Sequence, residues 1–253
     1  MRARVLFLSC LLAAAAAAGL WLAVLGLPAG DGLPPRSLEE RVRQYLITHP
    51  EVLNEAADAY QRRRERERSA ETLKLLTELR GRVRSAGDLP VLGNPEGDVT
   101  VVEFFDYRCP YCKRTLEELR RLVGGDPKLR LVFKEFPILG PDSLIASRAA
   151  IASRKQGKYL AFHIALMSHQ GALDAETVMA IAREAGLDTA RLRADMEDRE
   201  ASEILKETQA LAVRLGIEAT PTLIIGDEVH AGYADLDTLK RLVARARAGC
   251  KSC

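Results

Sequence analysis

The sequence predicts an α/β fold, because strand-like and helix-like apolar patterns alternate through residues 88–249. Residues 99–107 are a run of β-branched and aromatic side chains, which is typical of a buried strand. Residues 142–215 carry apolar side chains at helical spacing throughout. Residues 221–226 and 228–232 have the pattern of a closing hairpin. We therefore expect a small sheet whose two halves are separated in sequence by a helical insertion.

An uncharged, alanine-rich apolar run at residues 5–27 follows Arg2 and Arg4. This is the pattern of an export signal, and residues 28–30 (Pro-Ala-Gly) supply a candidate cleavage site. The run is also long enough to span a bilayer, so an uncleaved anchor is the alternative. In both cases the two arginines keep the N-terminus inside and the rest of the chain is exported. We expect residues 1–30 to be a signal peptide or signal anchor.

Residues 36–85 are predicted to form a helical segment. Ser37 and Glu40 have the spacing of a capping box at the start of a first helix, and Pro50 is predicted to begin a second. Residues 61–72 have no large apolar side chain, which predicts a solvated helical stalk. The helices could simply pack on the following domain. We favour self-association, because so small a unit has too little core to be stable alone.

Residues 99–107 lead directly into Cys109-Pro-Tyr-Cys112, which begins a predicted helix. A strand followed by a CxxC motif at a helix N-terminus is typical of thioredoxin-like redox sites. Free N–H groups and the helix dipole stabilise a thiolate there, so we expect Cys109 to be the exposed nucleophile. Two intervening residues place Cys112 one turn later, where a more buried thiol can resolve a mixed disulfide.

A structural zinc site uses the same cysteine spacing but needs two further ligands. His163 and His169 lie far along the chain in a predicted helical segment, where we expect helix surfaces or satisfied packing. The only other cysteine pair, Cys250 and Cys253, is at the C-terminal tail. We therefore expect no metal and no cofactor at the CxxC motif. The net charge of +2 also argues against nucleic acid as a partner.

Thr220 and Pro221 stand at the head of the predicted strand over residues 221–226. A proline there can be an ordinary edge-strand residue. In a thioredoxin-like fold the same position holds a cis-proline that faces the active-site sulfur, and cis peptide bonds are nearly always proline bonds. With the CxxC motif upstream, we favour the cis-proline.

Three motifs in this order, EFFDYRCPYC, KEFPILGPDSLIASRAA and GIEATPTLIIG, resemble the DsbA family of thiol–disulfide oxidoreductases. The resemblance covers residues 90–248 and implies a thioredoxin-like fold with a helical insertion. Residues 41–67 resemble the N-terminal domain of the periplasmic suppressor-of-copper-sensitivity protein C family. In that family the segment is an oligomerisation domain joined by a stalk to a DsbA-like domain. The resemblance implies a homo-oligomer and favours a trimer. We expect residues 36–85 to be this oligomerisation domain and stalk, and residues 88–249 to be the catalytic domain.

Glu103 lies six residues before Cys109 within the apolar strand, where a lone carboxyl group is costly to bury. It could reach solvent at the strand end, or it could relay a proton to and from the Cys112 sulfur. The DsbA-family pattern has an acid at this spacing, and we favour the relay. Lys134 is a plausible charge partner for Glu103, or it could equally be a surface residue.

Tyr111 departs from the strongly oxidising DsbA type, which carries a histidine between the proline and the second cysteine. Tyrosine cannot supply the positive charge that favours the thiolate. We therefore expect a less acidic Cys109 and an intermediate reduction potential, about −180 to −230 mV. Such a potential suits isomerisation, in which the enzyme attacks wrong disulfides and then leaves.

Three functions remain open. The first is a periplasmic, oligomeric disulfide isomerase or reductase that acts on unfolded or misdisulfided exported proteins and exchanges electrons with a membrane thiol–disulfide protein. The second is a DsbA-like oxidase that donates disulfides to folding chains. The third is a copper-binding or sequestering protein with a role in copper tolerance. The CxxC tail at residues 250–253 could be a local disulfide, a second dithiol or a soft Cu(I) pair.

Overall fold

The computed structural model describes residues 37–249. The predicted export signal and the tail cysteines Cys250 and Cys253 lie outside these residues. The chain divides into two compact units between Glu65 and Arg66. Within the described part of the chain, no helix combines the length and hydropathy that a bilayer span requires.

The first unit contains α2 (Leu38–Thr48) and the beginning of α3 (Glu51–Arg84). The predicted capping box is present, since the Glu40 N–H donates to Ser37 Oγ at 3.1 Å and the Ser37 N–H donates to Glu40 Oε2 at 3.3 Å. No residue of α2 is buried. Its apolar side chains, Tyr45 among them at 54% exposure, therefore pack into no core among the described residues of this unit.

The second unit is built on a five-stranded sheet with the order β1-β3-β2-β4-β5. The strands are β1 (Leu92–Gly93), β2 (Val99–Phe105), β3 (Leu129–Glu135), β4 (Thr222–Ile225) and β5 (Glu228–Ala231). Only the β2–β3 pair is parallel; the other three pairs are antiparallel. β1 is only two residues long, and residues 88–91 are not part of it. The Leu89 N–H instead closes a turn onto the Ala86 carbonyl, and Pro90 has no N–H to offer a ladder.

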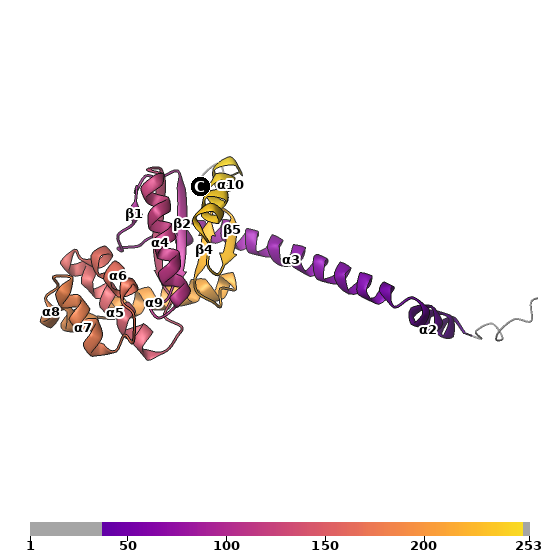
Figure 1. The fold of residues 1–253 in the computed structure, drawn as a ribbon, viewed down its shortest axis with the longest axis horizontal. Helices are drawn as coiled ribbons and strands as arrows, with labels where there is room; N and C mark the ends of the chain where they lie inside the picture. The colour runs from indigo at the N-terminus through magenta and orange to yellow at the C-terminus, as the bar shows by residue number, and fades with distance from the viewer. Residues whose placement is uncertain (1–36, 250–253) are drawn as a thin grey trace, which may run out of the picture. The chain divides into compact units, whose positions relative to one another are not determined.

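Helices cover both faces of the sheet (Figure 1). On one face lie α4 (Pro110–Gly125) and α10 (Leu236–Gly249), whose leucines pack against the odd-numbered residues of β2 and β3. On the other face, α9 (Arg199–Leu215) and the end of α3 pack against the even-numbered residues. The apolar stripe of α3 enters this core through Leu76, Leu79 and Val83. The last three turns of α3 are therefore part of the unit that holds the sheet.

Two basic side chains of β3 bind the C-terminal end of α3. Arg130 Nη1 donates to the Arg84 carbonyl oxygen at 2.7 Å. Lys134 Nζ donates to the carbonyl oxygens of Arg82 and Ser85 at 3.1 Å and 2.6 Å. The last carbonyls of a helix have no intrahelical partner and carry the negative end of its dipole. These two cations supply hydrogen-bond donors to the carbonyls and positive charge to the dipole.

The predicted helical insertion is present as a series of separate helices. They are α5 (Pro141–Ser153), η1 (Arg154–Gln156), α6 (Tyr159–Ser168), α7 (Ala175–Glu184) and α8 (Thr189–Met196), followed by α9. Left-handed glycines break the run, among them Gly157 at φ +68° and Gly186 at φ +77°.

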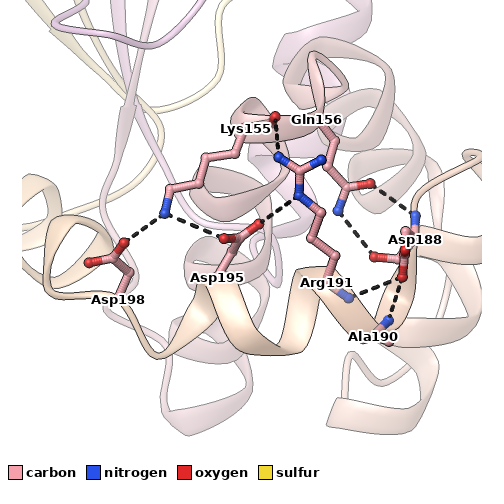
Figure 2. Close-up of polar contacts among 7 residues, drawn as sticks. All are labelled: Lys155, Gln156, Asp188, Ala190, Arg191, Asp195 and Asp198. Carbon is pink, nitrogen blue, oxygen red and sulfur yellow. Dashed lines mark hydrogen bonds and ion pairs between the residues drawn. The ribbon is translucent and has the colours of Figure 1, made fainter.

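Polar contacts connect η1 to α8 in this insertion (Figure 2). Gln156 exchanges two hydrogen bonds with the backbone of Asp188, the residue whose side chain caps α8. Lys155 Nζ donates to Asp198 at 2.6 Å and to Asp195 at 3.4 Å. These contacts are largely solvent-exposed, so they fix the arrangement of the short helices and contribute little to the free energy of unfolding.

Candidate active site

Cys109 is the N-cap residue of α4, and Pro110 is its first helical residue. The Cys112 N–H points at Cys109 Sγ across 3.4 Å, as expected for a sulfur at a helix N-terminus. Both cysteines are free thiols. Cys109 is only 4% exposed, so the prediction of an exposed nucleophile is wrong in degree, because the turn before α4 and the Thr220 loop cover the side chain. Cys112 is completely buried, and Cys109 remains the more accessible of the two.

The two thiols have very different acidities. The pKa of Cys109 is lowered to about 6, first by its hydrogen bond with Cys112 and further by the N–H groups of Cys112 and Tyr111, while burial acts in the opposite direction. Burial strongly raises the pKa of Cys112, and the neighbouring Cys109 and Glu103 raise it further. At neutral pH Cys109 is therefore a thiolate and Cys112 a thiol, which is the arrangement of a nucleophile and its resolving partner.

Thr220 and Pro221 lie against the nucleophile, as the sequence predicts. Their peptide bond is cis. Cys109 Sγ lies 3.3 Å from the Thr220 carbonyl oxygen, to which it donates a hydrogen bond when it is protonated. The Gly232 N–H donates to the Pro221 carbonyl at 2.8 Å, which ties this loop to the end of β5.

Glu103 is completely buried in the middle of β2. Neither carboxyl oxygen has a hydrogen-bond partner among the described residues. Burial raises the pKa of Glu103 to about 8, and the charge of Cys109 adds to the shift. Glu103 is thus mostly protonated at pH 7, and it is close enough to affect the pKa of Cys112.

Lys134 is not the charge partner of Glu103, so the structure excludes that one of the two alternatives. The parallel register pairs Lys134 with Phe104, so its side chain lies on the opposite face of the sheet from Glu103. There it binds the end of α3 and lines a cavity of about 420 Å³. Burial lowers the pKa of Lys134 to about 8.

A buried polar cluster behind the active-site turn was not predicted. The hydroxyls of Tyr107 and Tyr159 each donate to Glu135 Oε1 at 2.9 Å, and His163 Nδ1 lies 2.9 Å from the Tyr107 oxygen. Burial raises the pKa of Glu135 to about 8 and lowers that of His163 to about 3. His163 is thus a core residue with one satisfied ring nitrogen, while Nε2 has no partner in the described structure.

Asp106 is a second residue that the sequence analysis missed. It is completely buried between β2 and Cys109, and its two side-chain oxygens accept four hydrogen bonds. An acidic residue between a buried strand and a CxxC motif was the available signal. Elsewhere in residues 37–249, no group of three or more His, Cys, Asp or Glu side chains is arranged to hold a metal ion.

Comparisons with known proteins agree with this geometry. The family model of the DSBA-like thioredoxin domain matches residues 100–244, and that of the copper resistance protein ScsC N-terminal domain matches residues 36–67. The crystal structure of a thioredoxin-like oxidoreductase from Silicibacter pomeroyi DSS-3 is 48% identical with a TM-score of 0.66, covering 68% of this chain and 99% of that one. A linker-deletion mutant of Proteus mirabilis ScsC is 26% identical with a TM-score of 0.65, covering 87% of this chain and 99% of that one.

Curated relatives match about two thirds of the chain. The Na(+)/H(+) antiporter NhaA 1 of Salinispora arenicola is 31% identical over 163 residues, which is 64% of this chain and 25% of that protein. The chain spans about a quarter of the length of the curated relatives it matches.

Proposed function

Because the chain belongs to the DSBA-like thioredoxin domain family, we propose that it is an exported protein disulfide isomerase or reductase of the periplasm. It has the fold of a DsbA-like thiol–disulfide oxidoreductase. The observation that carries the proposal is the pairing of an acidic thiol, Cys109 with a pKa of about 6, with a buried thiol, Cys112, beside the Thr220 carbonyl.

In the proposed reaction, the Cys109 thiolate attacks a wrong disulfide in an exported protein. One substrate sulfur leaves as a thiolate and the other forms a mixed disulfide with Cys109. In isomerisation, another thiolate of the substrate then attacks the substrate sulfur of this mixed disulfide. A new disulfide forms within the substrate, and Cys109 is released as a thiolate. In reduction, Cys112 attacks Cys109 instead, which releases the substrate thiol and leaves the Cys109–Cys112 disulfide. A membrane thiol–disulfide protein would return this disulfide to the dithiol.

Glu103 supplies a base for the reduction route, in which Cys112 attacks the mixed disulfide. Cys112 must lose its proton to attack, and its raised pKa makes that step costly. A carboxyl group with a pKa of about 8 is ionised in about a tenth of the molecules at pH 7, so it can take this proton and later return it. Its burial away from other hydrogen-bond partners favours transfer to and from Cys112.

The moderate acidity of Cys109 supports an isomerase or reductase over an oxidase. The most strongly oxidising enzymes of this kind have a nucleophile with a pKa near about 3.5, which stabilises their reduced form. A pKa of about 6 implies a smaller stabilisation. The protein would then form and break disulfides with similar free energies, as isomerisation requires.

Self-association through the first unit is the second part of the proposal, with a trimer favoured. Residues 36–67 match the copper resistance protein ScsC N-terminal domain. Large apolar side chains of this unit are exposed in the single chain: Leu38, Val42, Tyr45, Ile47, Leu53 and Tyr60. Burying them between copies would give the unit the core that it lacks, and would hold several active sites around one substrate. Copper binding stays a hypothesis for Cys250 and Cys253, outside the described residues.

The test is reactivation of a scrambled, disulfide-rich protein by the reduced exported form, residues 31–253. The double variant Val42→Asp with Tyr45→Asp should be monomeric and lose most of the reactivation, while Gln44→Asp on the same helix should keep both oligomer and activity. Point variants are needed, because deleting residues 36–85 would also remove Leu76, Leu79 and Val83 from the catalytic core. Fast oxidation of a reduced substrate without any reactivation would instead favour the DsbA-like oxidase.

A further inference from the structure

The Asp106 carboxyl group collects four donors. Its Oδ1 accepts from the Arg108 N–H at 2.7 Å and from the Ser143 hydroxyl at 2.8 Å. Its Oδ2 accepts from the N–H groups of Ile138 and Leu139, each at 2.9 Å. Two of these donors belong to the loop before α5 and one belongs to α5 itself. The side chain therefore joins the end of β2 to the entrance of the helical insertion.

The main chain of Asp106 is bonded to the dithiol turn. Its carbonyl oxygen accepts from the Cys109 N–H at 3.1 Å. Its backbone also forms a hydrogen bond with Cys112 that works against the raised pKa of that thiol. Asp106 thus contacts the two cysteines through its backbone and residues 138–143 through its side chain.

Arg108 also binds residues 137–140, through a carbonyl group instead of the N–H groups that Asp106 binds. The Arg108 Nη1 donates to the Leu139 carbonyl oxygen at 2.6 Å. Gly140 has a φ of +113°, and a Cβ there would come within 3.2 Å of the same Nη1. Ile138 and Leu139 keep their side chains partly exposed. The loop therefore presents two apolar side chains beside the residue that precedes Cys109.

We infer that Asp106 is a positioning residue that fixes the Cys109 turn and the loop over residues 137–140 as one unit. The inference rests on the proposed thiol–disulfide exchange at Cys109. Three of the four donors are backbone N–H groups, which cannot reverse their role. An asparagine amide in place of the carboxyl group would aim its NH₂ group at either the Ile138 and Leu139 pair or the Arg108 N–H. In each orientation at least one N–H loses its acceptor on this completely buried side chain, and the turn or the loop must move.

The test is Asp106→Asn in the exported form, with the pH dependence of Cys109 alkylation as the readout. A displaced turn moves Cys109 away from the Cys112 N–H, so the midpoint of the profile should rise. A misplacement of about 1 Å can lower a reaction rate about 100-fold. A smaller displacement of the turn should lower the rate of attack on a disulfide at pH 7 about tenfold. Ser153→Ala is the matched control. It removes a buried hydrogen bond to the Ala150 carbonyl at the C-terminal end of α5, far from the turn, so it should lower stability and leave the midpoint unchanged.

An unchanged midpoint and rate in folded Asp106→Asn protein would overturn the inference and leave the proposed function standing. A wild-type protein without an acidic thiol would contradict the proposed function itself. Amide hydrogen exchange on the wild type needs no variant. The N–H groups of Arg108, Ile138 and Leu139 should be protected although they lie in loops, and free exchange at all three would show that the carboxyl group does not hold them.

Discussion

Cys109 and Thr220 lie 111 residues apart in the sequence, yet the Cys109 sulfur is 3.3 Å from the Thr220 carbonyl oxygen. The contact exists because β4 lies beside β2, with Glu103 paired to Leu223. The loop that enters β4 therefore ends next to the loop that leaves β2. A substrate disulfide that approaches Cys109 meets this carbonyl-bearing loop on one side and the turn from Asp106 on the other.

The two thiols should react over separate pH ranges. In reduced protein, alkylation of Cys109 should show a midpoint near pH 6, whereas Cys112 should stay unmodified through pH 9 because burial raises its pKa. The check is mass spectrometry after brief iodoacetamide pulses across this range. Cys112→Ala should raise the Cys109 midpoint, because it removes the hydrogen bond that lowers this pKa most, and it should accumulate mixed disulfides. Cys109→Ala is the control, which should lose the labelling near pH 6. Equal labelling of the two thiols at pH 7 would contradict the assignment.

Stability should fall as pH rises from 6.5 to 8. Glu103 and Glu135 have folded pKa values of about 8, raised from 4.5, so in this range the unfolded chain has released both protons while the folded chain retains them. For these two groups the unfolded state binds fewer protons, so each lowers the free energy of unfolding by up to about 1.4 kcal/mol per pH unit. Cys109 acts in the opposite direction, because its pKa is lowered from 9.0 to about 6, and it offsets about one of the two carboxyl groups. His163 acts below this range, since its folded pKa of about 3 makes stability rise with pH only up to 6.5.

The variant Glu103→Gln should bring the slope close to zero, because the remaining contributions of Glu135 and Cys109 have opposite signs. The measurement is urea unfolding at pH 6.5, 7.2 and 8.0. Glu117→Gln, on the exposed side of α4, should leave the slope as in the wild type. A slope that persists in full in Glu103→Gln would mean that Glu103 already ionises in the folded protein at neutral pH.

Tyr111→His should make Cys109 more acidic and the protein more oxidising. A protonated imidazole beside the helix N-terminus would add a positive charge that stabilises the thiolate and thus the reduced form. Tyr111 is 54% exposed, so the exchange leaves no cavity. The reduction potential, from equilibrium with glutathione, should rise by tens of millivolts, with about 30 mV for each tenfold change in the equilibrium constant. Tyr111→Phe, without a charge, should leave it unchanged.

Truncating a buried side chain at the end of α3 should destabilise the catalytic unit as a core substitution does. Leu79→Ala, at a side chain that is 4% exposed, should lower the free energy of unfolding of the catalytic unit by about 2–5 kcal/mol. Leu73→Ala, two turns earlier and 47% exposed, should change it by less than about 0.5 kcal/mol. Thermal unfolding followed by far-UV circular dichroism checks both. Similar effects for the two leucines would mean that α3 is no part of this core.

The sequence was sufficient where the chemistry is local. The strand, the CxxC motif and the helix are consecutive, so Cys109 at the N-cap and Pro110 in the first turn followed from residue order. The burial of Glu103 followed from its apolar neighbours. The placement of Lys134 away from Glu103 did not follow, because only the β2–β3 register assigns Lys134 to the opposite face of the sheet.

The contacts that the helical insertion makes with the sheet and the active-site turn could not be predicted. The bonds from Tyr159 to Glu135 and from Ser143 to Asp106 depend on how the helical insertion returns to the sheet, and no spacing within one segment encodes that. The stripe of Leu76, Leu79 and Val83 was visible as an apolar face. The pattern alone did not show whether it meets a second copy or the chain's own sheet.

β3 separates two environments by residue parity. Arg130 and Lys134 bind the end of α3 on one face, while Glu135 accepts the tyrosine hydroxyls on the other. A single inserted or deleted residue in this strand would exchange the two faces, putting a lysine among aromatic rings and a carboxyl group against helix carbonyls. Related sequences should therefore vary freely in the identity of the apolar residues of β3, yet keep its length fixed.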